Sequence, residues 1–199
     1  MNTGVVHANV GVPPEHGESL ATAQMSMNKG LKLFSNAGIE AVRSEMVQLH
    51  DRKVMKPVHS RELTPEERRE ALAYLMFLKR KRCGKVKGRG CADGRKQRRY
   101  TDRADAASPT VATEAVFLTA VINALENRDV AVIDIPGAFM QVDLDDETIH
   151  VRLTGKMVEL LLEIDQKMYE PYLVRERGEM IMYIELLKAL YGTMRAAAV

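Results

Sequence analysis

One acidic residue stands where a metal ligand would be expected. The segment from Val130 to Ile133 is apolar and β-branched, which is typical of a buried strand, and Asp134 follows it directly. Pro136 and Gly137 then end the strand, because proline cannot donate a ladder hydrogen bond and glycine tolerates unusual dihedral angles. A carboxylate at a strand exit is well placed to bind Mg²⁺. The alternative is that Asp134 caps the turn or the following helix.

Other metal-ligating residues are scattered along the chain. Cys83 and Cys91 form neither a CxxC pair nor a disulfide framework and fit a reducing compartment. No two of the five histidines have the i, i+4 spacing of a helical zinc site. The acidic run after the predicted strand could supply a second metal ligand or could form a solvated loop; it comprises Asp143, Asp145, Asp146 and Glu147.

The positive charge is concentrated in one block. The chain has 29 Lys/Arg and 27 Asp/Glu, and residues 79–103 contain 12 of the basic residues but only Asp93 and Asp102 of the acidic ones. The remaining residues therefore have a net charge of −8. We predict that this block binds a polyanion, with Arg80, Lys87 or Arg89 on phosphates. The alternative is a solvated charge run that binds nothing in particular.

The periodicity of the sequence predicts the elements that would carry these residues. Helices are expected from Ser35 or Asn36, from Thr64 to about Ala73, after Ser108-Pro109 as a core helix, and around 157–164. Strands are expected at 54–58 (an edge strand, because of Pro57), 130–133 and 148–153, with hairpins at about 74–92 and 173–186. Helices and strands without strict alternation indicate an α+β fold, with an antiparallel sheet and helices on one face.

Three sequence blocks resemble the reverse transcriptase of copia-type retrotransposons. They are Ser108-Pro109-Thr110-Val111, then Val132-Ile133-Asp134-Ile135-Pro136-Gly137-Ala138-Phe139, and finally Lys188-Ala189-Leu190-Tyr191-Gly192. Their order and spacing fit the family over about residues 36–197. The resemblance implies a partial right-hand polymerase at 35–199, with a fingers hairpin at about 74–92 and a palm from about 108. Residues 1–34 would be a disordered or loosely structured extension.

The resemblance also implies roles for individual residues. Asp134 would be a catalytic carboxylate that binds Mg²⁺ together with the backbone carbonyl of Ile135. Phe139 would exclude the ribose 2′-hydroxyl of a dNTP, or else would simply pack in the core. Arg80, Lys87 and Arg89 would contact an RNA template, an RNA–DNA hybrid or the nucleotide phosphates.

The chain departs from the family in two places. The Tyr-x-Asp-Asp strand that supplies the other metal ligands is absent, and Arg195-Ala196-Ala197 replaces the family's segment after Tyr191-Gly192. The resemblance therefore implies a fragment of a retrotransposon polyprotein that is inactive alone. The alternatives are a non-catalytic nucleic-acid-binding module and a degenerate relic whose incomplete sheet aggregates through an unpaired edge. The sequence shows neither a secretory signal nor a membrane span, so an intracellular location, in cytoplasm or nucleus, is expected.

Overall fold

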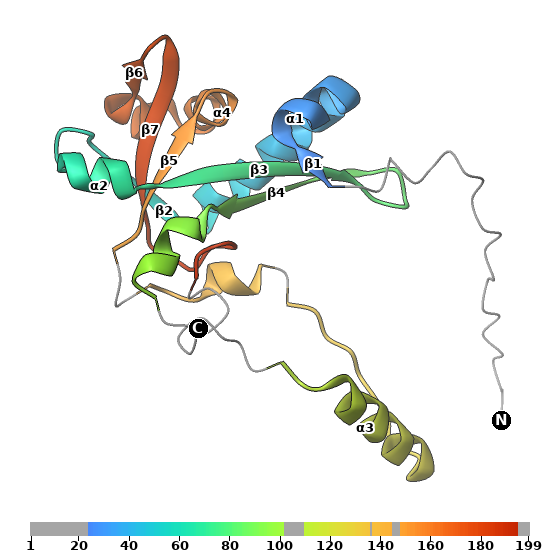
Figure 1. Cartoon of the computed structure of the whole chain (residues 1–199). Helices are drawn as coiled ribbons and strands as arrows, with labels where there is room; N and C mark the ends of the chain where they lie inside the picture. The colour runs from blue at the N-terminus through green and yellow to red at the C-terminus, as the bar shows by residue number, and fades with distance from the viewer. Residues whose placement is uncertain (1–23, 102–109, 136, 145–147, 195–199) are drawn as a thin grey trace.

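The fold is an α+β arrangement around one mixed sheet (Figure 1). The computed structural model describes residues 24–101, 110–135, 137–144 and 148–194. The strand order is β1-β3-β5-β7-β2, with β4 paired to β3 and β6 paired to β7. Every pair is antiparallel except β3–β5, which is parallel, so the antiparallel sheet predicted above is wrong at that pair. The strands are β1 (Met25–Ser26), β2 (Met55–Val58), β3 (Leu72–Arg80), β4 (Val86–Ala92), β5 (His150–Thr154), β6 (Val174–Glu176) and β7 (Glu179–Leu186).

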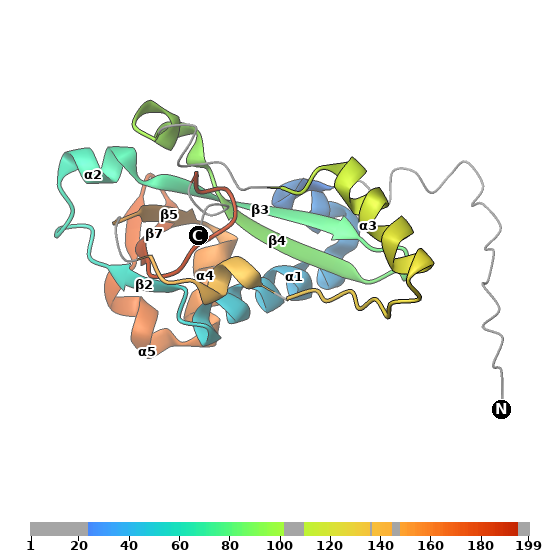
Figure 2. The ribbon, with the colours of Figure 1, turned by 90° about the horizontal axis from the view of Figure 1, so that it is seen from below.

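The main core lies on one face of the sheet, under α1 and α4. Alternate residues of β7 divide between the two faces, as the pleat requires. Met182 and Ile184 join the main core, whereas Ile181 and Tyr183 join a small cluster on the opposite face. Figures 1 and 2 show α1 along one side of the β3–β4 hairpin. The helices are α1 (Met27–Asp51), α2 (Pro65–Glu70), α3 (Thr113–Leu125), α4 (Lys156–Ile164) and α5 (Gln166–Tyr169), with short 3₁₀ turns η1 (Gly94–Arg99), η2 (Ala138–Gln141) and η3 (Glu170–Tyr172).

Helix α1 begins earlier than the sequence predicts. It starts at Met27 and is interrupted at Ser35, whose φ of 47° and ψ of −125° are not helical. The predicted helix from Ser35 or Asn36 therefore corresponds to the second part of α1. Before it, β1 pairs with β3, and the first helical part packs so closely on Leu78 that a methyl at Gly30 would lie 2.6 Å from Leu78 Cδ1. The fold thus includes residues that precede the predicted boundary at 34/35.

Locally encoded elements agree with the sequence. Thr64 and Glu67 form the predicted capping box, in which each side chain accepts a hydrogen bond from the other's backbone N–H, at 3.1 and 2.7 Å. Helix α2 ends at Glu70, before the predicted Ala73, because β3 begins at Leu72. The β3–β4 hairpin has the predicted limits, from Tyr74↔Ala92 to Arg80↔Val86. The edge strand β2, β5, α4 and the β6–β7 hairpin also confirm their predictions.

Two predictions in the middle of the chain are wrong. The apolar residues of α3 were expected to pack in the core, but none is buried, and Phe117 is 68% exposed. Figure 1 shows α3 apart from the sheet. The predicted buried strand before Asp134 is an exposed coil, with Val132 95% exposed. An apolar run forms a buried strand only where a partner surface covers it, and no described strand pairs with this segment.

Candidate nucleic-acid interface

One face of the β3–β4 hairpin is basic and partly apolar. Residues directly opposite each other in an antiparallel pair share a face, and the pairs Phe77↔Arg89 and Lys79↔Lys87 lie on the face away from the core. We call Phe77, Lys79, Lys87 and Arg89 the outer face. Its three charged residues are exposed and Phe77 is half-buried. Like charges directly opposite are unfavourable, so this face favours an anion that neutralises Lys79 and Lys87.

The predicted phosphate ligands do not all lie together. Lys87 and Arg89 belong to the outer face, but Arg80 pairs with Val86 and shares the alternation of Tyr74, Met76 and Leu78. That alternation defines the face that packs toward α1. Lys79 and Phe77, which the sequence-based prediction left out, take the place of Arg80. The signal that would have found them is the register, which depends on the length of the turn between the strands.

Tyr191 links the outer face to the segment that follows Asp134. The Arg89 guanidinium carbon lies 5.7 Å from the centroid of the Tyr191 ring, within the range of a cation–π contact. Phe139 meets the same ring edge-on, with centroids 4.7 Å apart and an interplanar angle of 82°. Two of the predicted site residues, Arg89 and Phe139, are therefore brought together through a tyrosine from the third sequence block.

Backbone hydrogen bonds fix the position of Tyr191. Its carbonyl oxygen accepts a hydrogen bond from the Ala92 amide at 2.7 Å, at the end of β4. Upstream, the Ala189 amide donates to the Val142 carbonyl at 2.9 Å, which ties the segment to the turn after Phe139. Downstream, the buried Gln97 side chain accepts from the Met194 amide at 3.0 Å. The Tyr191 ring is thus held by the chain on both sides.

The described residues do not assemble a metal site around Asp134. Asp134 and Ile135 are exposed in coil, and within residues 24–101, 110–135, 137–144 and 148–194 no three His, Cys, Asp or Glu side chains could hold one ion. Asp143 is exposed and pairs through its backbone with Lys188, while Asp145, Asp146, Glu147 and Pro136 lie outside the described residues. Among the described residues, Asp134 has too few oxygen ligands around it to hold Mg²⁺, so the Mg²⁺ site stays a prediction and no step is derived through it.

A buried polar group that sequence reasoning missed connects α1 to β4. Glu45 is buried, and its carboxylate accepts a hydrogen bond from the Gly90 amide at 3.0 Å. Burial raises the pKa of Glu45 above its ordinary value, against the lowering effects of this hydrogen bond and of Lys87 and Arg89. Glu45 therefore holds β4 in place directly behind Arg89.

The Tyr74 side chain occupies the space that Gly90 leaves open. Tyr74 is buried, and a methyl at Gly90 would overlap its hydroxyl group. That hydroxyl has no hydrogen-bond partner among the described residues, and burial raises the pKa of Tyr74 well above its ordinary value. The glycine at position 90 of β4 is thus explained by the tyrosine that packs across it.

Glu45→Gln should alter the pH dependence of folding. A raised pKa means that the folded state binds the proton more tightly, so the carboxyl contributes fully at low pH and its contribution falls as pH rises through the folded pKa. The difference in unfolding free energy between wild type and Glu45→Gln should therefore be less favourable to wild type at about pH 7 than at about pH 4. Urea unfolding of both proteins at the two pH values measures this. An equal difference at both would show that Glu45 titrates normally.

The comparisons with known proteins leave the resemblance dependent on the three sequence blocks. No family model matches the chain, and neither a curated protein nor a solved structure matches it. Among the described residues, no helix combines the length and the apolar character that crossing a bilayer would require. The fold itself defines the chain as an α+β protein with a mixed sheet.

Proposed function

We propose that the chain binds a polynucleotide through the outer face of its β3–β4 hairpin. The observation that carries this proposal is the register that sets Lys79 directly opposite Lys87, beside Arg89 over the Tyr191 ring. A phosphate between the two ammonium groups would relieve their repulsion because it carries the opposite charge. Each phosphate neutralised also releases counterions into solution, which favours binding. Phe77 lies opposite Arg89 in the hairpin and Tyr191 lies under Arg89, and both are half-buried aromatic residues on which a base could stack.

We further propose that this face is the fingers part of a copia-type reverse transcriptase. The proposal is supported by the three blocks in family order and by the contacts through which Phe139 and Arg89 meet at Tyr191. On this proposal the polynucleotide is an RNA template or an RNA–DNA hybrid, and Phe139 borders the dNTP. Asp134 is the residue that we assign to Mg²⁺ and to polymerisation, which would need further carboxylates.

Removing the facing lysines should weaken polynucleotide binding and its dependence on salt. The double variant Lys79→Ala/Lys87→Ala should make the negative slope of log K against log[salt] less steep by about 2, because each lysine contributes about 1. The measurement is a salt series of fluorescence anisotropy with a labelled RNA–DNA primer–template. The matched control is Lys167→Ala, which removes an exposed lysine from α5. An unchanged slope in the double variant would contradict binding by the outer face.

Primer extension separates the polymerase proposal from simple binding. The second candidate function, a non-catalytic nucleic-acid-binding module, is favoured by the exposed position of Asp134, which belongs to no group of three described metal-ligating side chains. Extension with Mg²⁺ and dNTPs that Asp134→Asn abolishes would support polymerisation. Salt-sensitive binding without extension, unchanged in Asp134→Asn, would support the binding module. No binding at low salt would contradict both.

A further inference from the structure

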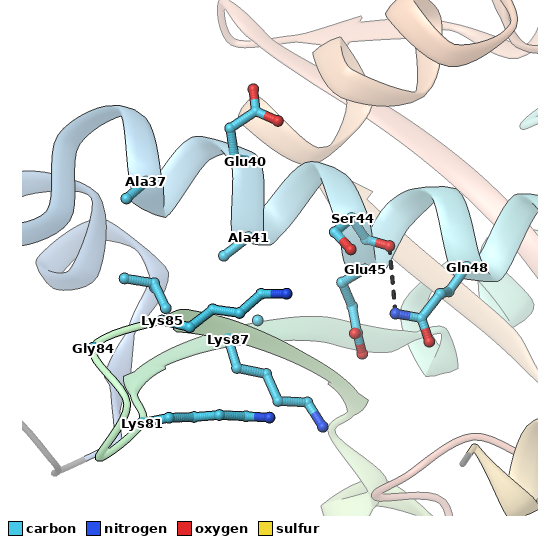
Figure 3. A pocket seen from close by; sticks show the side chains of 12 residues that line it. Ala37, Glu40, Ala41, Ser44, Glu45, Gln48, Lys81, Gly84, Lys85 and Lys87 are labelled. Carbon is cyan, nitrogen blue, oxygen red and sulfur yellow. Dashed lines mark hydrogen bonds between the residues drawn. The ribbon is translucent and has the colours of Figure 1, made fainter.

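A cavity of about 570 Å³ lies between α1 and the tip of the β3–β4 hairpin (Figure 3). It is on the α1 side of the hairpin and includes Lys87 of the outer face, but none of Phe77, Arg89, Phe139 or Tyr191. Its volume is in the range of small-molecule sites. The close approach of β4 to α1 at Gly88, where a methyl would lie 2.6 Å from the Ala41 carbonyl oxygen, fixes the distance between its two walls.

The hairpin wall of the cavity is positively charged. Lys81, Lys85 and Lys87 line it, and the ion pairs found in the described part of the chain include none of them. In Figure 3 their side chains run in the same direction, away from the turn at Gly84. Of the two acids that border the cavity, Glu40 points away from the hairpin, and Glu45 accepts the Gly90 amide. Three ammonium groups therefore face one space with incomplete compensation.

The α1 wall is polar and carries no aromatic ring. Ser44 and Gln48 present a hydroxyl and an amide there, and Gln48 donates to the Ser44 carbonyl at 3.5 Å, a long bond that a ligand could displace. The neighbouring side chains on this wall, Ala37 and Ala41, are small. A nucleobase would find no stacking partner in such a cavity. A body that carries hydroxyl groups would find donors and acceptors.

We propose that this cavity binds a compact phosphorylated polyol. Its phosphate groups contact Lys81, Lys85 and Lys87, and its hydroxyl groups face Ser44 and Gln48. Vicinal phosphates on a small ring match three ammonium groups that point into one space, since charge-assisted hydrogen bonds are the strongest that lysine makes. This site shares Lys87 with the outer face, but Lys81, Lys85 and the α1 wall belong to the cavity alone, so the proposal does not depend on polynucleotide binding.

Isothermal titration of the full chain with inositol 1,4,5-trisphosphate, at 0.15 M salt, tests the proposal. Lys85→Ala should weaken binding about tenfold, the effect of one charge-assisted contact. Ala37→Leu should also abolish binding, because it fills the cavity from an exposed helical position without changing charge. Lys167→Ala, on α5, is the matched charge control and should bind as wild type.

Arg89→Ala distinguishes this site from the polynucleotide interface. It should weaken binding to the primer–template and leave the trisphosphate affinity unchanged, because Arg89 does not line the cavity. The proposal is overturned if no heat is detected at millimolar ligand, or if Ala37→Leu binds normally. It is also overturned if the chain binds phosphoinositide vesicles and free inositol trisphosphate does not compete, because a cavity ligand must compete with its own headgroup.

Discussion

Gly192→Ala should destabilise the chain by about 3 kcal/mol or more. This cost is the sum of two penalties, one for a left-handed backbone at a residue with a side chain and one for a steric overlap. Gly192 has a φ of +90°, and a methyl there would overlap the carbonyl oxygen of Ala92. Neither atom can move independently, because the Ala92 amide binds the Tyr191 carbonyl and the Gly94 backbone lies against Gly192. Urea unfolding followed by circular dichroism measures the loss. A variant that stays folded should also bind the primer–template more weakly, since Tyr191 would be displaced.

Gly178→Ala provides the matched control. Gly178 has a φ of +82°, but a methyl there would have no heavy atom within 4 Å. This variant isolates the cost of the left-handed backbone, about 1–2 kcal/mol. The excess of Gly192→Ala over Gly178→Ala then measures the overlap with Ala92. Equal stability of the two variants would contradict the close packing of Gly192 against Ala92 at the end of β4.

Gly90→Ala should cost about 2–3 kcal/mol, the usual penalty for overpacking a core that cannot relax. The added methyl would overlap the Tyr74 hydroxyl, and the Tyr74 ring is buried in the main core. In a Tyr74→Leu background, whose shorter side chain leaves the space empty, the same substitution should cost much less. In the double-mutant cycle from urea unfolding, the double variant should therefore be more stable than the sum of the two single costs predicts.

Tyr74→Phe is the control for the hydroxyl group itself. Because that hydroxyl is buried without a hydrogen-bond partner among the described residues, its removal should leave stability unchanged or raise it by about 1 kcal/mol. A large loss in Tyr74→Phe would show that the hydroxyl is satisfied. Additive costs for Gly90→Ala and Tyr74→Leu would show that the two residues do not compete for one space.

The elements that the sequence predicts correctly are those fixed by neighbouring residues. Thr64 and Glu67 encode the start of α2 within four positions, and Arg177 and Gly178, with φ of 51° and 82°, form the two-residue turn between β6 and β7. The hairpin at 74–92 follows in the same way from its turn at Gly84. In each case the residues that determine the conformation are adjacent in the chain.

The elements that the sequence predicts wrongly depend on distant partners. Val130 to Ile133 has the composition of a buried strand, but burial requires a partner surface, and no described strand pairs with this segment. The apolar residues of α3 meet no surface for the same reason. The predicted site residues Arg89, Lys87 and Phe139 lie on or beside the hairpin, whereas Asp134 and Ile135 lie in exposed coil, and the roles of all five stay predictions.

The outer edge of β4 is completed by residues that lie far apart in the sequence. The Gly90 amide is bound by Glu45 from α1, and the Ala92 amide by Tyr191, near the end of the described structure. During synthesis the contact with α1 can form early, whereas the half of the edge at Ala92 stays open until about a hundred further residues have left the ribosome. An open strand edge in a nascent chain is a template for association with another chain. The block that contains Tyr191 therefore closes an edge of β4 that is open while the intervening residues are being made.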